Sequence, residues 1–150
     1  VSVLRTGVLG TTGVESAALV RSVAALVRPD RVVAVDALSA RETARLCKAV
    51  QVSDAGIVPG SGVGNARSAL TQETLGVPVV AVGVPTVVDA RTLCADLTGS
   101  DASLPEGAEF FVTPRDIDSR VRDSARLVGY AIDLALHDAL TIEDIDMFLS

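Results

Sequence analysis

The chain has 150 residues, of which 49% are hydrophobic and 21% charged, a balance that excludes a disordered tail and predicts one compact domain over residues 1–150. Thirteen basic residues, scattered along the chain, face nineteen acidic ones, and the net charge of −6 disfavours nucleic acid as a partner. Because no uncharged run reaches about 18 residues and no secretory signal opens the chain, we expect no membrane partner and a cytoplasmic location.

The opening residues predict a strand, a helix and a second strand. Residues 1–5 form a short extended run that starts without an initiator Met, so we expect an N-terminal portion to be missing. Thr12 and Glu15 have the spacing of a capping box and predict the start of a helix. Residues 31–36 are almost unbroken apolar up to Asp36, which is typical of a strand covered on both faces.

The middle of the chain predicts two helices and two strands. In chain order these are a helix over 39–50, a short strand over 51–53, a buried strand over 78–84 and a helix over 86–97. Residues 56–76 are irregular, and a segment of that length inside a compact domain is typical of a functional loop. A polar connection follows at 99–107.

The last third is predicted to be helical. Thr113 and Pro114 predict the start of a long helix that runs to about residue 139, and Thr141 with Asp144 predicts a short final helix. Strands that alternate with helices predict an α/β fold with three layers, in which helices flank a mostly parallel sheet.

Three carboxylates follow the predicted strands: Asp36, Asp54 and Asp89. Since ligands of an open α/β sheet bind beyond the carboxyl ends of its strands, these side chains are candidates for one shared rim. A partly desolvated carboxylate suits acid or base chemistry. Local structural roles stay open for all three, as a turn cap at Asp36, an Asx turn at Asp54 and a first-turn helix acid at Asp89.

A glycine-rich segment, PGSGVGN over 59–65, supplies the other candidate site-lining residues. These are Gly60, Ser61, Gly62, Gly64 and Asn65. The segment lacks the patterns of phosphate-binding and dinucleotide-binding loops, which disfavours a nucleotide. Its glycines would let the backbone approach a peptide or donate amides to an oxyanion, and a plain loop is the alternative.

The sequence offers no triad and no zinc site. The only histidine, His137, lies near the end of the long predicted helix, where a cation complements the helix dipole. Cys47 and Cys94 lie in predicted helices and are interpreted as reduced, packed thiols. A Ser–His or Cys–His hydrolase is therefore disfavoured, and no cofactor and no metal are expected. The chemistry that remains for this chain is that of its carboxylates.

Five segments in the same order resemble the germination protease family of spore-forming bacteria, endopeptidases that degrade small acid-soluble spore proteins. They are TGVLGTTGVE (6–15), VAVDALSAR (33–41), QVSDAG (51–56), PGSGVGN (59–65) and TLGVPVVAVGVPTVVDA (74–90). The resemblance runs from about residue 1 to 97 and resumes with FVTP (111–114) and ALH (135–137).

The resemblance implies a fold similar to the hydrogenase maturation endopeptidases, a zymogen with a removable propeptide, and an atypical acid protease with two aspartates. One aspartate maps onto Asp36, and the other belongs to a motif N-terminal to these residues. It further implies small acid-soluble spore proteins as substrates, a homo-oligomer such as a tetramer, and a location in the forespore or spore core.

The chain departs from the family pattern at two places. Val58 stands where the family usually has a histidine, so no role of that histidine carries over. The connection over 99–107 is shorter than in many relatives, which affects details of the substrate groove and of subunit contacts.

The predicted function is an endopeptidase in which Asp36 and an upstream carboxylate activate water together. One alternative is metal-assisted chemistry with Asp36 and Asp54 as ligands, which the lack of a well-placed histidine weakens. The other is a non-catalytic binding module on the same scaffold. Residues 1–150 alone are expected to be inactive as a protease and to self-associate.

Overall fold

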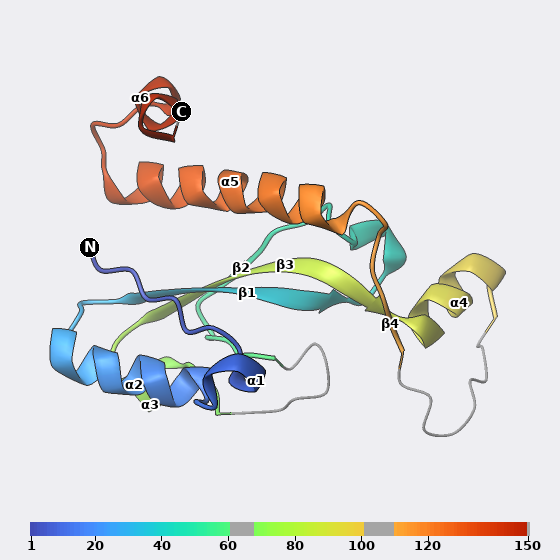
Figure 1. Cartoon of the computed structure of the whole chain (residues 1–150), viewed down its shortest axis with the longest axis horizontal. Coiled ribbons are helices and arrows are strands. Elements are labelled where there is room, and N and C mark those ends of the chain that lie inside the picture. Colours follow the sequence, from blue (N-terminus) through green and yellow to red (C-terminus); the bar gives the residue numbers. More distant parts are fainter. Residues whose placement is uncertain (61–67, 101–109, 150) are drawn as a thin grey trace. The chain divides into compact units, whose positions relative to one another are not determined.

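The structure is a computed structural model that describes residues 1–60, 68–100 and 110–149. The chain forms two compact units, Val1–Val112 and Thr113–Ser150. The first unit holds the described strands and the second holds two helices (Figure 1). A single domain over residues 1–150 stays a prediction.

The sheet of the first unit is mixed. Strand β1 (Val32–Ala40) runs parallel to β3 (Val79–Asp89), whereas β2 (Gln51–Ser53) and β4 (Phe111–Val112) run antiparallel to β3. The order β1-β3-β2, with β4 also on β3, puts β3 inside the sheet and β1 at its edge. The α/β class with flanking helices is confirmed, but among the described strands only one pairing of three is parallel. The three layers and the similarity to hydrogenase maturation endopeptidases stay predictions.

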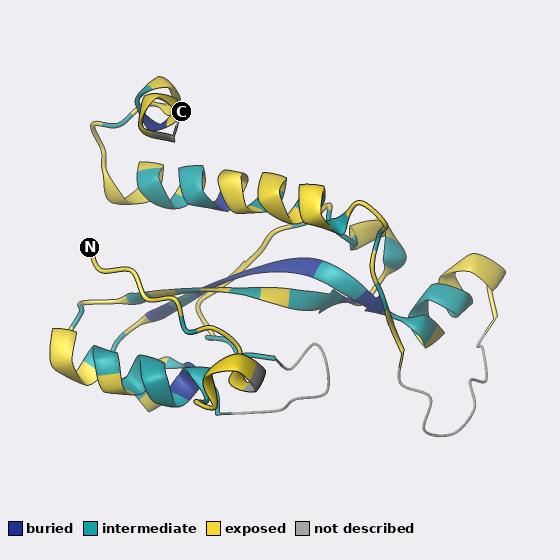
Figure 2. Ribbon diagram, viewed as in Figure 1, coloured by how far each residue is buried: buried dark blue, intermediate teal, exposed yellow. Residues whose placement is uncertain are grey.

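The core of the sheet is β3. Val79 and Val88 are 2% and 0% exposed, and Figure 2 shows much of β3 as buried. In β1, by contrast, burial alternates, and Val33 and Val35 are 37% and 54% exposed. The prediction of a strand covered on both faces therefore holds for β3 and is wrong for β1, because successive side chains point to opposite faces and those of Val33 and Val35 share the exposed one.

The first unit also contains four α-helices and one 3-10 turn among the described residues. They are α1 (Leu9–Thr12), α2 (Ser16–Val27), the 3-10 turn η1 (Thr43–Arg45), α3 (Gln72–Leu75) and α4 (Ala90–Thr98). Helices α2 and α3 are in contact and lie on the same side of the sheet in Figure 1. Helix α4 continues directly from the end of β3.

The start of the chain differs from its prediction. Residues 1–8 form no strand, and α1 precedes α2. The capping box of Thr12 and Glu15 does not form, because the Thr12 hydroxyl turns back to donate to the Val8 carbonyl at 3.1 Å. Glu15 itself is the N-cap residue of α2, and its carboxylate accepts a 3.0 Å hydrogen bond from the Ser68 N–H.

The structure corrects two predicted helices, those over 39–50 and 86–97, because each of these segments begins as strand. The segment 39–50 continues β1 to Ala40 and then forms η1 and turns, and residues 86–89 extend β3. Both corrections have one cause: β1 and β3 go on pairing up to Ala40 and Val88, past a register shift between Leu38 and Ser39. The short strand over 51–53 is confirmed as β2.

The second unit consists of α5 (Ile117–Leu136) and α6 (Ile142–Leu149). Helix α5 begins after Asp116 rather than at Thr113. The predicted start of α6 is confirmed, since the Thr141 N–H donates to the Asp144 carboxylate at 2.9 Å and the Asp144 N–H donates to the Thr141 hydroxyl at 3.2 Å. No helix within the described ranges combines the length and the apolar character needed to cross a membrane.

Candidate functional site

Asp36 is the centre of the candidate site. It lies in the middle of β1, opposite Gly83, and not at the end of the strand as predicted. One carboxylate oxygen accepts a 2.9 Å hydrogen bond from the Ala37 N–H. The other accepts a 3.3 Å hydrogen bond from the Gly60 N–H. Asp36 and Gly60, both candidate site residues, are thus brought together. The turn cap proposed for Asp36 does not form, because Ala37 continues strand β1.

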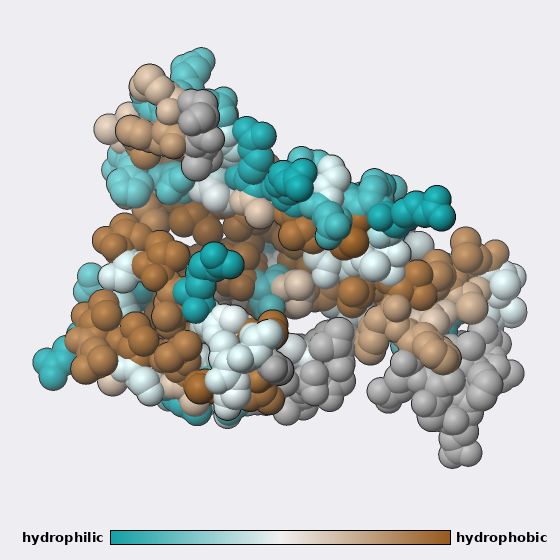
Figure 3. Space-filling model, in the orientation of Figure 1, coloured by the Kyte–Doolittle hydropathy of each residue, from teal (hydrophilic) through white to brown (hydrophobic). Residues whose placement is uncertain are grey.

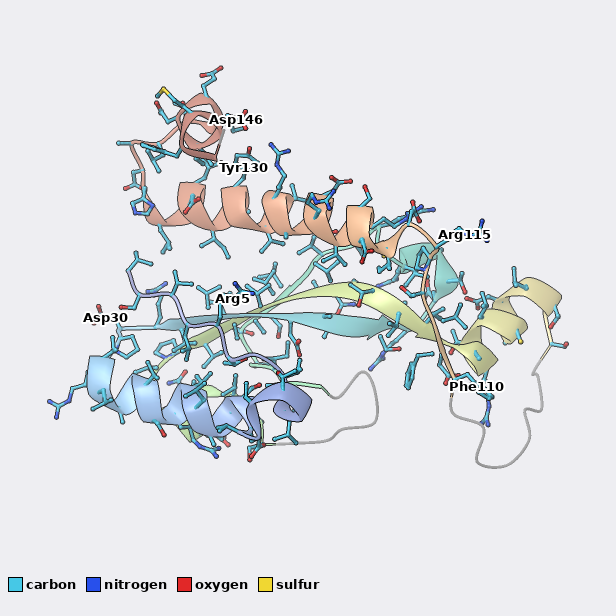
Figure 4. The ribbon with its side chains drawn as sticks, viewed as in Figure 1. Arg5, Asp30, Phe110, Arg115, Tyr130 and Asp146 are labelled. Atoms are coloured by element: carbon cyan, nitrogen blue, oxygen red, sulfur yellow. The ribbon has the colours of Figure 1, made fainter. Side chains whose placement is uncertain are left out.

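A hollow of about 570 Å³ opens beside this carboxylate. Its walls come from the N-terminal segment, from α2, from the first half of β1 and from Ile57 and Leu70, and Asp36 and Gly60 are part of them. Most of these side chains are apolar, and Figure 3 shows apolar atoms gathered where α2 and the strands lie. The carboxylate therefore lies at a mostly apolar cavity of the size that takes a small ligand or part of a peptide.

The backbone next to the site requires glycine at two positions. Gly60 has a φ of 74° and Gly56 a φ of 83°, values that side chains with a Cβ rarely adopt. Gly56 also lies so close to Leu70 that a Cβ at residue 56 would come within 2.2 Å of the Leu70 carbonyl oxygen. Ile57 and Leu70 bond each other's backbones at 3.0 and 2.7 Å. These contacts join Ile57 and Leu70, which flank the glycine-rich segment, close to the Gly60–Asp36 hydrogen bond.

The structure does not gather the three carboxylates on one rim. Asp89 ends β3 about 20 Å beyond the level of Asp36, at the usual rise of a strand. There it accepts hydrogen bonds from the Arg91 and Thr92 N–H groups as the N-cap of α4. Asp54 is exposed and follows β2, whose antiparallel direction carries it toward the start of β3. The prediction of a shared rim assumed parallel strands of equal length and is wrong.

The remaining predicted residues are accounted for as follows. Ser61, Gly62, Gly64 and Asn65 lie outside the described residues. His137 is the C-cap of α5, and its Nδ1 lies 3.1 Å from the Asp133 carbonyl oxygen. Cys47 and Cys94 are half-buried, Cys94 in α4 as predicted and Cys47 in a turn after η1 rather than in a helix.

The metal-assisted alternative takes Asp36 and Asp54 as ligands. Within residues 1–60, 68–100 and 110–149, no three His, Cys, Asp or Glu side chains lie close enough to hold a metal ion. Asp36, in β1, and Asp54, which directly follows β2, are the two ligands of that alternative, and β3 lies between these two strands in the sheet.

Sequence reasoning missed two features of the site. Val20, Val23 and Val27 have the spacing of one helical face, and in the structure they line the hollow. Glu15 is predicted to cap a helix through its side chain, but its carboxylate accepts a hydrogen bond from the Ser68 N–H instead. The helical period of the valines was a correct signal for one face of α2, although it cannot tell a filled face from one that borders a cavity.

A sequence profile of the germination proteases matches residues 1–99. The chain belongs to the germination protease family. The germination proteases of Clostridium tetani and Caldanaerobacter subterraneus are 35% and 36% identical to it, over 96% and 99% of this chain and 54% and 56% of their own lengths. That of Bacillus pumilus is 53% identical over 64% of this chain and 26% of its own length.

This membership confirms the resemblance drawn from the five segments, all of which lie within the matched residues. The chain spans about half the length of the first curated germination proteases that it matches. Asp36 and Gly60 fall inside the matched part, and the helices α5 and α6 fall outside it.

Proposed function

We propose that the protein is an endopeptidase that initiates the degradation of small acid-soluble spore proteins during germination, with Asp36 as one of two catalytic carboxylates. The observation that carries the proposal is the place of Asp36: it belongs to a germination protease segment and lies at the mostly apolar hollow, bonded to the Gly60 N–H.

The chemistry needs a second carboxylate, which we assign to a chain segment outside these 150 residues. Two neighbouring carboxylates do not both ionise readily, so one stays protonated and acts as the acid while the other acts as the base. The base takes a proton from water, the resulting hydroxide attacks the peptide carbonyl carbon, and the acid protonates the departing amine. The proposal extends to self-association as a homo-oligomer and to the forespore or spore core as the location.

The test is the conversion of Asp36 to asparagine in the complete gene product, assayed on a purified small acid-soluble spore protein. Asp36→Asn removes the ionisable group at nearly constant size, so cleavage should be lost while the circular dichroism spectrum stays that of a folded protein. The exposed Asp54 provides a matched control, and Asp54→Asn should cleave as the parent does. Turnover retained by Asp36→Asn would refute the assignment.

The same assay separates the two alternatives. Exhaustive chelation should leave cleavage unchanged, whereas a loss that one specific divalent ion restores would favour metal-assisted chemistry. If the parent protein binds the spore protein without cleaving it, the non-catalytic binding module becomes the better explanation.

A further inference from the structure

One edge of the sheet is open beside Asp36. Strand β1 pairs only with β3 among the described strands, and the Val32 N–H donates to the Pro78 carbonyl of the segment leading into β3. Because backbone groups of a strand point to its two sides in turn, those of Val33 and Val35 point away from β3. Neither has a backbone hydrogen bond outside the β1–β3 ladder in the described part of the chain.

Nothing in the sequence of β1 closes this edge. Edge strands are commonly protected by lysine, proline, a bulge or short length. Strand β1 is nine residues long, VVAVDALSA, without lysine or proline, and its register shift comes only after Leu38. Its one charged side chain is Asp36. The edge next to Val33 and Val35 is therefore suited to take on another strand.

The Asp36 carboxylate reaches this open edge. Ala37 follows Val33 and Val35 in the alternation, so its N–H also points away from β3, and it donates to the Asp36 carboxylate at 2.9 Å. One oxygen of Asp36 consequently lies where the backbone of an added strand would run. The other oxygen bonds Gly60 at the hollow.

We propose that the open edge of β1 binds the peptide substrate as an added β-strand, so that a peptide bond of the substrate lies at Asp36. This inference rests on the proposed function. The backbone of the peptide bonds Val33 and Val35, and every second side chain of the peptide lies over the hollow. Val20, Val23, Val27, Ile57 and Leu70 line that hollow, so these side chains are apolar.

Charge favours a peptide over a second copy of the chain at this edge. Two β1 strands paired about a twofold axis near Asp36 would set two Asp36 carboxylates opposite or diagonal to each other, and each chain carries a net charge of −6. The N-terminal segment does not take the place either. Val1 and Val3 are 94% and 89% exposed, and residues 1–5 make no backbone hydrogen bond with other described residues.

The experiment is a scan of backbone N-methylation. Overlapping peptides that tile a small acid-soluble spore protein are labelled and titrated against the complete gene product carrying Asp36→Asn, so that they are not cut. The peptide that binds best is then methylated at one backbone nitrogen at a time. A strand on β1 bonds through every second amide, so affinity should fall about three- to tenfold at alternate positions and less than about twofold between them.

Two measurements on the protein locate the strand. Val35→Pro removes the outward N–H, and proline is tolerated at an edge position. It should bind the peptide several-fold more weakly than Val35→Ala, which keeps the N–H. Amide hydrogen exchange in the parent provides the same information if the proline variant fails to fold, because peptide should slow exchange at Val33 and Val35.

The outcomes separate this inference from the proposed function. Cleavage of the spore protein with a flat methylation scan leaves the proposed function standing and overturns strand addition. If methylation weakens binding at alternate positions but the parent protein does not cleave the spore protein, strand addition stands and the proposed function is overturned. Strand addition at β1 is also overturned if no peptide binds, if an alternating scan leaves Val33 and Val35 unprotected, or if these amides become protected with rising protein concentration in the absence of peptide.

Discussion

Asp36 accepts a 3.3 Å hydrogen bond from the backbone N–H of Gly60, a residue twenty-four positions further along the chain. Its other oxygen accepts from Ala37 at 2.9 Å, so the two carboxylate oxygens serve two donors. This arrangement couples the edge strand to the turn that begins the glycine-rich segment. An asparagine has one acceptor oxygen and an NH₂ group, which cannot serve both donors.

Asp36→Asn should therefore lower the free energy of unfolding slightly while leaving the fold intact. One of the two hydrogen bonds is lost, and we expect a cost of about 1 kcal/mol. Asp36→Ala loses both and should cost more. Urea unfolding of the three proteins, followed by circular dichroism, measures the differences. Equal stability of all three would show that these hydrogen bonds contribute nothing in solution.

Gly56→Ala should destabilise the protein much more than Gly76→Ala. Both glycines have a positive φ, 83° and 75°, so both substitutions carry the conformational cost of about 1 kcal/mol. Only at residue 56 does the new Cβ meet backbone, 2.2 Å from the Leu70 oxygen, while at residue 76 nothing lies within 4 Å. The melting temperatures of the two variants provide the comparison, and similar values would contradict the close approach.

Asp89→Ala should destabilise the protein by about 1 kcal/mol because α4 loses its N-cap. Asp89→Ser, which keeps an acceptor for the Arg91 and Thr92 N–H groups, should recover most of that loss. Thermal unfolding checks both. If Asp89→Ala instead lowered activity by more than the loss of folded protein explains, a role of Asp89 in the site would return to consideration.

The α6 region should lose stability in acid through Asp144. Hydrogen bonds from the Thr141 N–H and hydroxyl lower the pKa of Asp144 below its ordinary value of 3.8. A carboxyl whose pKa is lower in the folded state stabilises that state above 3.8, and this contribution is lost as the pH falls through the lowered pKa.

An acid titration of hydrogen exchange in α6 measures this dependence. Asp144→Asn should reduce the change of hydrogen exchange in α6 with pH. Glu143→Gln is the matched control, since Glu143 lies one residue earlier and its side chain makes no hydrogen bond with the described residues. The same pH dependence in all three proteins would show that the capping box does not control the stability of α6.

Short sequence patterns correctly predicted the elements whose formation depends on neighbouring residues in the chain. The apolar run over 78–84 predicted the first half of β3, which begins at Val79, and the Thr141–Asp144 spacing predicted the start of α6. Ser39 and Glu42 have the same spacing, yet Ser39 lies in β1. Its backbone pairs with a strand almost fifty residues away, and such long-range pairing overrides a local helix signal.

The site was predicted in part for a related reason. Asp36 and Gly60 were both named, because a charged end to an apolar run and a cluster of glycines are visible in the sequence. Their contact, and the separation of Asp54 and Asp89 from them, depend on the direction of β2 and the length of β3. No short motif records the direction of a strand relative to its neighbour.

The position of β3, between its partners in the sheet and late in the sequence, affects how the protein folds during synthesis on the ribosome. Every pairing between the described strands includes β3, so none of them can form before Val79 and the residues after it have left the exit tunnel. Strand β1 is made earlier and waits on the order of seconds at bacterial synthesis rates of about 5–20 residues per second. During that time the nascent chain presents VVAV, four apolar residues in a row, as a binding segment for chaperones.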